Sequence, residues 1–118
     1  MISVKNLSKF FGPVKALQNV SFQINRGEIV GILGPNGAGK TTMMRLITGF
    51  FPPTEGAILI EGQNLSKSKP NFRKKIGYLA ENNPLYRDMT ASAFLSFVAH
   101  MKGVSFRSRR EAVQKVMD

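Results

Sequence analysis

The residues with the clearest chemical potential lie in one short glycine-rich stretch. Residues 34–41 read Gly-Pro-Asn-Gly-Ala-Gly-Lys-Thr, which fits the phosphate-loop pattern G-x-x-x-x-G-K-[ST] at every fixed position. Glycines let the backbone turn sharply and approach phosphate oxygens closely, so that consecutive N–H groups can point at an anion. The pattern therefore predicts a site for the phosphates of a nucleotide.

Two side chains at the end of this phosphate loop add to its chemistry. The Lys40 ammonium can reach the β- and γ-phosphates, and the Thr41 hydroxyl can act as a ligand of Mg²⁺. An ordinary connection between a strand and a helix would explain the glycines, but not a Gly-Lys-Thr sequence at this spacing. The loop alone does not define a reaction, because kinases, GTPases and motor ATPases share it.

A phosphate loop needs a strand before it and a helix after it. Residues 28–33 form an apolar run with β-branched members, as in strands that are buried on both faces. Residues 40–48 have a helical pattern, and Gly49 is a natural stop. The sequence thus predicts a strand, the loop and a helix in succession.

Other short strands surround this unit. Apolar residues within 2–7 and the alternation over 20–24 predict two strands, expected to be antiparallel, ahead of the loop. Further strands are expected over 57–60 and 76–80, with a polar loop over 64–71 between them. The order of elements predicts an α/β fold.

Helices are expected towards the end of the chain. Residues 91–101 have a helical pattern, with Thr90 as the N-cap and Gly103 as the stop. Ser108 and Glu111 form a capping-box pair, which predicts a last helix that begins there and runs to the end of the sequence.

Composition limits the possible functions. The 118 residues suffice for one small domain, and the absence of cysteine excludes disulfides and thiolate metal sites. No apolar run approaches the roughly 20 residues needed to cross a bilayer, so a soluble, cytoplasmic chain is expected. The net charge of +10 suggests an anionic partner, but apart from runs at 73–75 and 107–110 the basic residues are scattered. Nucleic acid is therefore not among the expected partners.

Stretches around the loop resemble the ATPase domain of ABC transporters over nearly the whole chain. The loop lies within Leu-Gly-Pro-Asn-Gly-Ala-Gly-Lys-Thr-Thr, the form typical of that family. The matching flanking motifs are Leu-Ser-Lys-Phe-Phe-Gly at 7–12, Ala-Leu at 16–17, Asn-Val-Ser-Phe at 19–22, Arg-Gly-Glu at 26–28, Leu-Ile-Thr-Gly at 46–49, Pro-Thr-Glu-Gly at 53–56 and Ile-Glu-Gly at 60–62. Each motif is weak alone, but their shared order is specific.

The resemblance implies a phosphate-loop NTPase fold that is present in part. Residues 1–80 would carry an antiparallel β subdomain and the first part of a mostly parallel core sheet, with the phosphate loop at 34–41. Residues 81–118 would begin the helical subdomain. The implied activity is ATP hydrolysis coupled to transport, with ATP and Mg²⁺ as cofactors.

The resemblance also assigns roles to individual residues. Phe11 takes the place of the aromatic residue, usually Tyr, that stacks on adenine, and Phe10 is the alternative if the register shifts by one. Glu81 takes the place of a Gln that contacts Mg²⁺ and the attacking water; an exposed loop acid is the alternative interpretation. With Lys40 it completes the implied catalytic pair. The implied nucleotide contacts of the loop are Asn36, Gly37, Ala38, Gly39, Lys40, Thr41 and Thr42.

A third set of expectations concerns partners. In the family, the region that begins at residue 81 receives a transmembrane permease, so Leu85, Tyr86 and Met89 would form the contact; packing onto the helix at 91–101 is the alternative. The pattern at 78–86 is most similar to export-type members. The family also implies a head-to-tail homodimer and a place on the cytoplasmic face of the membrane.

Other family motifs are missing from the 118 residues. There is no Leu-Ser-Gly-Gly-Gln-like signature, no apolar strand that ends in Asp-Glu, and no switch histidine, since His100 comes too early. The sequence predicts a truncated product or an excised fragment that does not hydrolyse ATP alone. The alternatives left open are a soluble ABC ATPase that acts on ribosomes or DNA, another phosphate-loop enzyme, and an inactive remnant.

Overall fold

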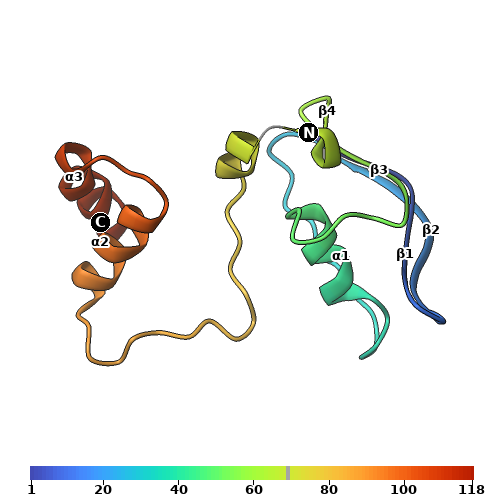
Figure 1. Ribbon diagram of the computed structural model, residues 1–118, viewed down its shortest axis with the longest axis horizontal. Coiled ribbons are helices and arrows are strands. Elements are labelled where there is room, and N and C mark those ends of the chain that lie inside the picture. The colour runs from blue at the N-terminus through green and yellow to red at the C-terminus, as the bar shows by residue number, and fades with distance from the viewer. Residues whose placement is uncertain (69) are drawn as a thin grey trace. The chain divides into compact units, whose positions relative to one another are not determined.

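The computed structural model describes residues 1–68 and 70–118, which form two compact units, Met1–Tyr78 and Leu79–Asp118 (Figure 1). The first unit contains a sheet and one α-helix. The second unit contains two helices that pack against each other. Each unit is described by itself below.

The first unit is built on a four-stranded antiparallel sheet. Its strands are β1 (Ile2–Phe11), β2 (Val14–Ile24), β3 (Glu55–Ile60) and β4 (Gln63–Asn64), in the spatial order β2-β1-β3-β4. The two predicted strands before the loop are confirmed, although both are longer than expected. The predicted turn at Glu61 and Gly62 is also confirmed, because both residues have positive φ (49° and 76°), as a tight hairpin requires.

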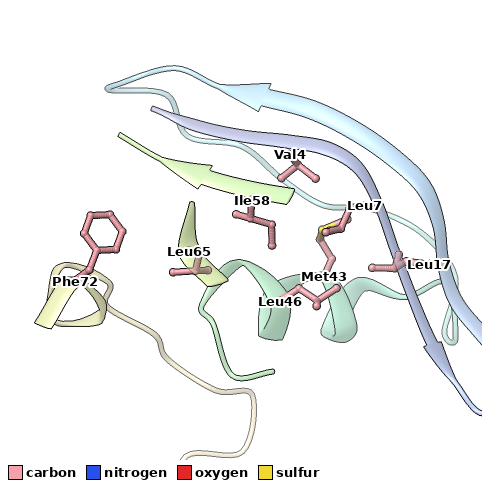
Figure 2. Close-up of a cluster of buried hydrophobic side chains, with 8 residues drawn as sticks. All are labelled: Val4, Leu7, Leu17, Met43, Leu46, Ile58, Leu65 and Phe72. Atoms are coloured by element: carbon pink, nitrogen blue, oxygen red, sulfur yellow. The ribbon is translucent and has the colours of Figure 1, made fainter. Parts of the chain in front are cut away.

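Helix α1 (Lys40–Ile47) packs on one face of this sheet and ends before Gly49, whose φ is 71°. Apolar positions on β1 and β3 meet two positions one turn apart on the helix, Met43 and Leu46. Figure 2 shows this core, whose buried residues are Val4, Leu7, Leu17, Met43, Leu46, Ile58, Leu65 and Phe72. The helix that follows the phosphate loop is thus fixed to the sheet by buried apolar area.

Two 3-10 helices, η1 (Leu65–Lys67) and η2 (Pro70–Lys75), occupy most of the stretch predicted as a polar loop over 64–71, so that prediction was wrong. The reason is apolar burial. Leu65 and Phe72 are among the buried core residues, and Asn64 caps η1 by accepting a hydrogen bond from the Ser66 N–H. Burial of a few apolar residues is therefore enough to give this largely polar stretch helical structure.

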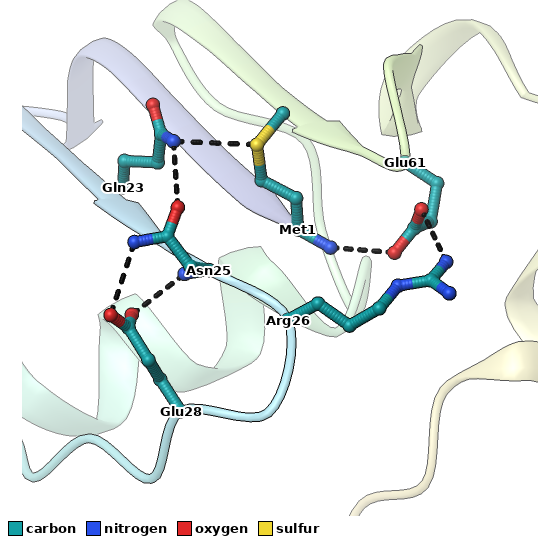
Figure 3. Close-up of polar contacts among 6 residues, drawn as sticks. All are labelled: Met1, Gln23, Asn25, Arg26, Glu28 and Glu61. Carbon is teal, nitrogen blue, oxygen red and sulfur yellow. Dashed lines mark hydrogen bonds and ion pairs between the residues drawn. The ribbon is translucent and has the colours of Figure 1, made fainter.

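Polar contacts join the ends of the strands (Figure 3). The Glu61 carboxylate accepts hydrogen bonds from the Met1 amine (2.5 Å) and from Arg26 (2.9 Å), and these contacts hold the pKa of Glu61 below its usual value. Glu28 accepts from the side chain and backbone of Asn25, which lowers the pKa of Glu28 in the same way. These bonds fix the turn that leads out of β2.

The predicted strands over 28–33 and 76–80 are absent, so this part of the prediction was wrong. Both segments are irregular, and Ile29 and Leu33 are 102% and 94% exposed. A strand is stable only when neighbours bond its N–H and C=O groups. In the part of the chain described, no strand pairs with either segment. The residue pattern of a buried strand is there, but its partners are not.

The second unit contains α2 (Ala91–Met101) and α3 (Phe106–Met117). The Thr90 hydroxyl accepts a hydrogen bond from the Ala93 N–H (3.2 Å), so the predicted N-cap is confirmed. The predicted start of the last helix was wrong. Ser105, in an extended conformation, caps α3 by accepting from the Ser108 N–H, which places Ser108 inside the first turn. Among the described residues, no helix has the length and apolar character needed to span a membrane.

Candidate functional site

The phosphate loop connects the exposed segment 28–33 to α1. At its centre the Ala38 N–H donates to the Pro35 carbonyl (3.2 Å), which closes a turn through Asn36 and Gly37. Gly37 has a φ of 83°, a left-handed conformation that glycine adopts without strain. Asn36 to Ala38 are exposed, so the backbone of the turn is open to a ligand.

Gly39 fixes the end of the loop against β2. It is the N-cap residue of α1, with a φ of 91°. A Cβ atom at this position would lie 2.7 Å from the carbonyl oxygen of Ala16 and 2.7 Å from Cδ2 of Leu17. Only glycine fits such a close approach of two backbones. The contact explains why the loop enters the helix beside the start of β2.

The N-terminal end of α1 has the electrostatic character of an anion site. The first turn contains no acidic residue, and no side chain caps the free N–H groups. The aligned peptide dipoles place partial positive charge at this end, and the unpaired N–H groups can donate to an anion. Thr42 is half-buried there, and Thr41 is exposed.

The Lys40 ammonium lies against the loop. Its Nζ donates to the carbonyl oxygens of Gly34 and Pro35, the latter at 3.1 Å. The side chain is therefore folded back over the turn, where a phosphate bound by the loop would meet it. The Lys40 ammonium and the free N–H groups at the start of α1 are donors, so the arrangement fits a polyphosphate.

The exposed Thr41 hydroxyl is an oxygen that could serve Mg²⁺ as a ligand. Among the described residues there is no group of three His, Cys, Asp or Glu that could hold a metal ion. Mg²⁺ typically keeps several waters and binds through one or two protein oxygens together with phosphates. The residues present thus fit a metal that arrives with the nucleotide, not a separate metal site.

The two candidate aromatic residues differ in exposure. Phe11, the last residue of β1, is 46% exposed. Phe10 is half-buried, and its N–H donates to the Thr54 hydroxyl. Because Leu17 pairs with Lys9 and also contacts Gly39, the end of β1 lies beside the loop. Phe11 and residues 36–42 thus belong to the same unit.

The other predicted site residues belong to the second unit. Glu81 is an exposed residue in an irregular segment. Leu85 and Tyr86 are 64% and 60% exposed, and Met89 is 40% exposed. The Tyr86 ring contacts Phe97 edge to face, with 5.8 Å between centroids, so part of this segment does pack onto α2.

Sequence reasoning missed two side chains near Phe11. Lys9 and Phe51 both contact the Phe11 ring. The position of Lys9, two residues before Phe11 on one face of a strand, was a usable signal. Phe51 lies 40 residues away in sequence, and no pattern connected it to Phe11.

Comparison with known proteins identifies the family. Residues 17–118 match the sequence profile described as ABC transporter. The chain belongs to this family. It is 36% identical over 118 residues to the probable multidrug ABC transporter ATP-binding protein YbhF of Escherichia coli, and 38% identical over 118 residues to the uncharacterized ABC transporter ATP-binding protein YxlF of Bacillus subtilis. All of this chain is matched in both cases, with 20% and 38% of those proteins.

A solved structure shows the same fold. A dimeric post-hydrolysis state of the ATP-binding cassette MJ0796, bound to ADP and Pi, matches with a TM-score of 0.77 and 29% identity, over 98% of this chain and 55% of that one. The predicted phosphate-loop fold class and the family resemblance are thus confirmed. The chain spans about a fifth to two fifths of the length of these sequence relatives.

Proposed function

We propose that this chain is the ATP-binding part of a subunit that energises an ABC transporter, and that it binds Mg-ATP through residues 34–41. The observation that carries the proposal is the loop itself. Gly39 is held at β2, the start of α1 has free N–H groups and no acid, and the Lys40 ammonium faces the turn. These groups together offer hydrogen-bond donors and positive charge to a polyphosphate.

Each residue of the site would have a different role in binding Mg-ATP. Free backbone N–H groups within residues 36–42 would donate to the phosphates, while the Ala38 N–H holds the turn through its bond to Pro35. Lys40 would compensate the charge on the β- and γ-phosphates. Mg²⁺, when bound, would neutralise further phosphate charge, with Thr41 as a ligand and Glu81 as a second proposed contact. Phe11 would stack its open face on adenine, since a Phe ring has the π-face of the usual Tyr.

The proposed partner is a separate transmembrane permease that contacts Leu85, Tyr86 and Met89 at the cytoplasmic face of the membrane. The exposure of Leu85 and Tyr86 supports it. An export-type system fits the pattern at 78–86 and the multidrug transporter named for the Escherichia coli relative. In that assembly, two ATP-binding subunits would pair head to tail.

We also propose that the 118 residues alone bind ATP without hydrolysing it. Phosphoryl transfer depends on positioned charges and an oriented water. The loop provides the phosphate contacts, but the sequence has no signature motif, no Asp-Glu strand end and no switch histidine. Loss of one such electrostatic contact raises the activation barrier by about 2.7–4 kcal/mol, so the loss of several removes detectable turnover.

Calorimetric titration with Mg-ATP, followed by a phosphate-release assay, tests both points. The chain should bind ATP, the Lys40→Ala variant should not, and neither should release phosphate. Lys5→Ala is the matched control, because Lys5 is an exposed lysine of β1. Equal affinity in the Lys40→Ala variant would reject the proposed site. Turnover that disappears in that variant would show that the chain needs no further catalytic groups.

A further inference from the structure

A cluster of three phenylalanines and a lysine lies at the end of β1. The rings of Phe11 and Phe51 meet edge to face, with 5.5 Å between centroids and 88° between planes. Phe50 meets Phe51 in the same manner at 5.9 Å. The Lys9 Nζ lies 5.2 Å from the Phe11 centroid and 5.0 Å from the Phe51 centroid.

The backbone determines why these side chains meet. Lys9 and Phe11 are two residues apart on β1, so they project from the same face of the strand. Lys9 pairs with Leu17, which is buried in the core against α1, so this is the face that α1 covers. Phe51 follows the end of α1, and the Lys9 Nζ donates to the carbonyl of Pro52 (2.8 Å). The cluster therefore joins the end of β1 to the segment after α1.

The Phe11 ring is only partly covered by its neighbours. The distances among the Lys9 ammonium, the Phe11 ring and the Phe51 ring form a nearly equilateral triangle, so both neighbours lie in similar directions from the Phe11 centroid. Phe11 is 46% exposed, which fits a ring that is covered only in part. A flat ligand could therefore stack on the exposed part of the ring without displacing either neighbour.

We infer that Lys9 and Phe51 are positioning residues that hold the Phe11 ring ready for the purine of ATP. The inference rests on the proposed function, in which Phe11 stacks on adenine. A side chain that must be immobilised on binding reduces affinity, and one already held in place does not. A Phe ring has no hydroxyl with which to fix itself, so the edge contact with Phe51 and the cation of Lys9 are what hold it.

The test compares ligands with and without a base. Calorimetry gives the Kd of Mg-ATP and of magnesium tripolyphosphate for the 118-residue chain and its Phe51→Leu and Lys9→Met variants. Each variant should weaken ATP binding about 2- to 10-fold, the range that corresponds to one side chain's ordering, and leave tripolyphosphate binding unchanged. Lys9→Arg should restore ATP binding, because it keeps the cation and the donor. Lys5→Met, on the exposed part of β1, should change neither ligand.

Two results would overturn the inference. If both ligands weaken in parallel in both variants, the cluster supports the fold and does not position the ring. If neither Kd changes, Phe11 needs no support from its neighbours. Lys9→Met keeps the apolar volume of the lysine stem, so a folding defect in Phe51→Leu alone does not decide the outcome.

Phe11→Ala separates this inference from the proposed function. Loss of the preference for ATP over tripolyphosphate in Phe11→Ala, with no change in Phe51→Leu and Lys9→Met, would reject only the positioning role. An unchanged preference in Phe11→Ala would reject the stacking role and the positioning role together, while the phosphate site of Lys40 would stand.

Discussion

Helices α1 and α2 show opposite relations between sequence and burial. α1 begins with Lys-Thr-Thr and is the more polar helix, yet Met43 and Leu46 are buried. Only Ser92, Ser96 and His100 are polar in α2, and none of its 11 residues is buried. Apolar content therefore does not decide burial here. One face of α1 is buried because a sheet covers it. This packing fixes the helix at the end of the phosphate loop.

Among the substitutions that test this difference between the helices, Leu46→Ala should have the largest effect. Leu46 is fully buried, so the loss of contacts and the cavity should lower the free energy of unfolding by about 2–5 kcal/mol. Leu95→Ala in α2 is the matched change, and because Leu95 is only half-buried the loss there should be about 1 kcal/mol. Urea denaturation followed by circular dichroism measures both. Equal losses would contradict the contrast between the two helices.

Gly39→Ala should have the next largest effect, because the new Cβ would clash with the Ala16 carbonyl and because φ is 91°. We expect a loss of about 1–3 kcal/mol in the same denaturation experiment. Gly37→Ala is the control. Its φ is 83°, but nothing lies within 4 Å of the added atom, so it reports the backbone strain alone. If Gly39→Ala lowers the free energy of unfolding no more than Gly37→Ala does, the contact with β2 does not anchor the loop.

Thr90→Ala should affect α2 alone. Removing the hydroxyl that accepts from the Ala93 N–H should cost this helix about 1 kcal/mol. Hydrogen exchange should speed up in the first turn of α2 and stay unchanged in α1. Faster exchange in both helices would mean that the two units unfold together, against the division seen between residues 78 and 79.

Ile29→Ser should have the smallest effect on stability, within about 0.5 kcal/mol, because Ile29 is wholly exposed. The same change should reduce self-association, since unpaired apolar segments promote aggregation. Thermal unfolding and light scattering at increasing concentration measure the two effects. A large loss of stability would show that residues 28–33 are buried in solution. The segment would then not differ in burial from the covered face of α1.

Local signals in the sequence predicted much of the fold. The alternation over 20–24, the stop at Gly49, the turn at Glu61 and Gly62, and the cap at Thr90 are each decided by a few neighbouring residues, and the structure has them all. The start of the last helix was misplaced because two serines three residues apart, Ser105 and Ser108, both suit an N-cap.

What the sequence could not provide was the pairing of strands. Residues 28–33 and 76–80 have the composition of buried strands, but a strand also requires neighbours, and composition does not say whether they are present. The same limit applies to the site. The phosphate loop is contiguous and could be predicted, whereas the contact between Phe11 and Phe51 depends on how the end of β1 meets the segment after α1.

Amide NMR can show whether the loop of the first unit binds the phosphates of ATP. Addition of Mg-ATP to the labelled chain should shift the amide resonances of residues 37–42, where the loop and the start of α1 would meet the phosphates, and leave those of α2 and α3 in place. Lys40→Ala should remove these shifts, and Lys5→Ala should not. Shifts confined to the second unit, or shifts at residues 37–42 that persist in Lys40→Ala, would rule out phosphate binding by the loop and Lys40.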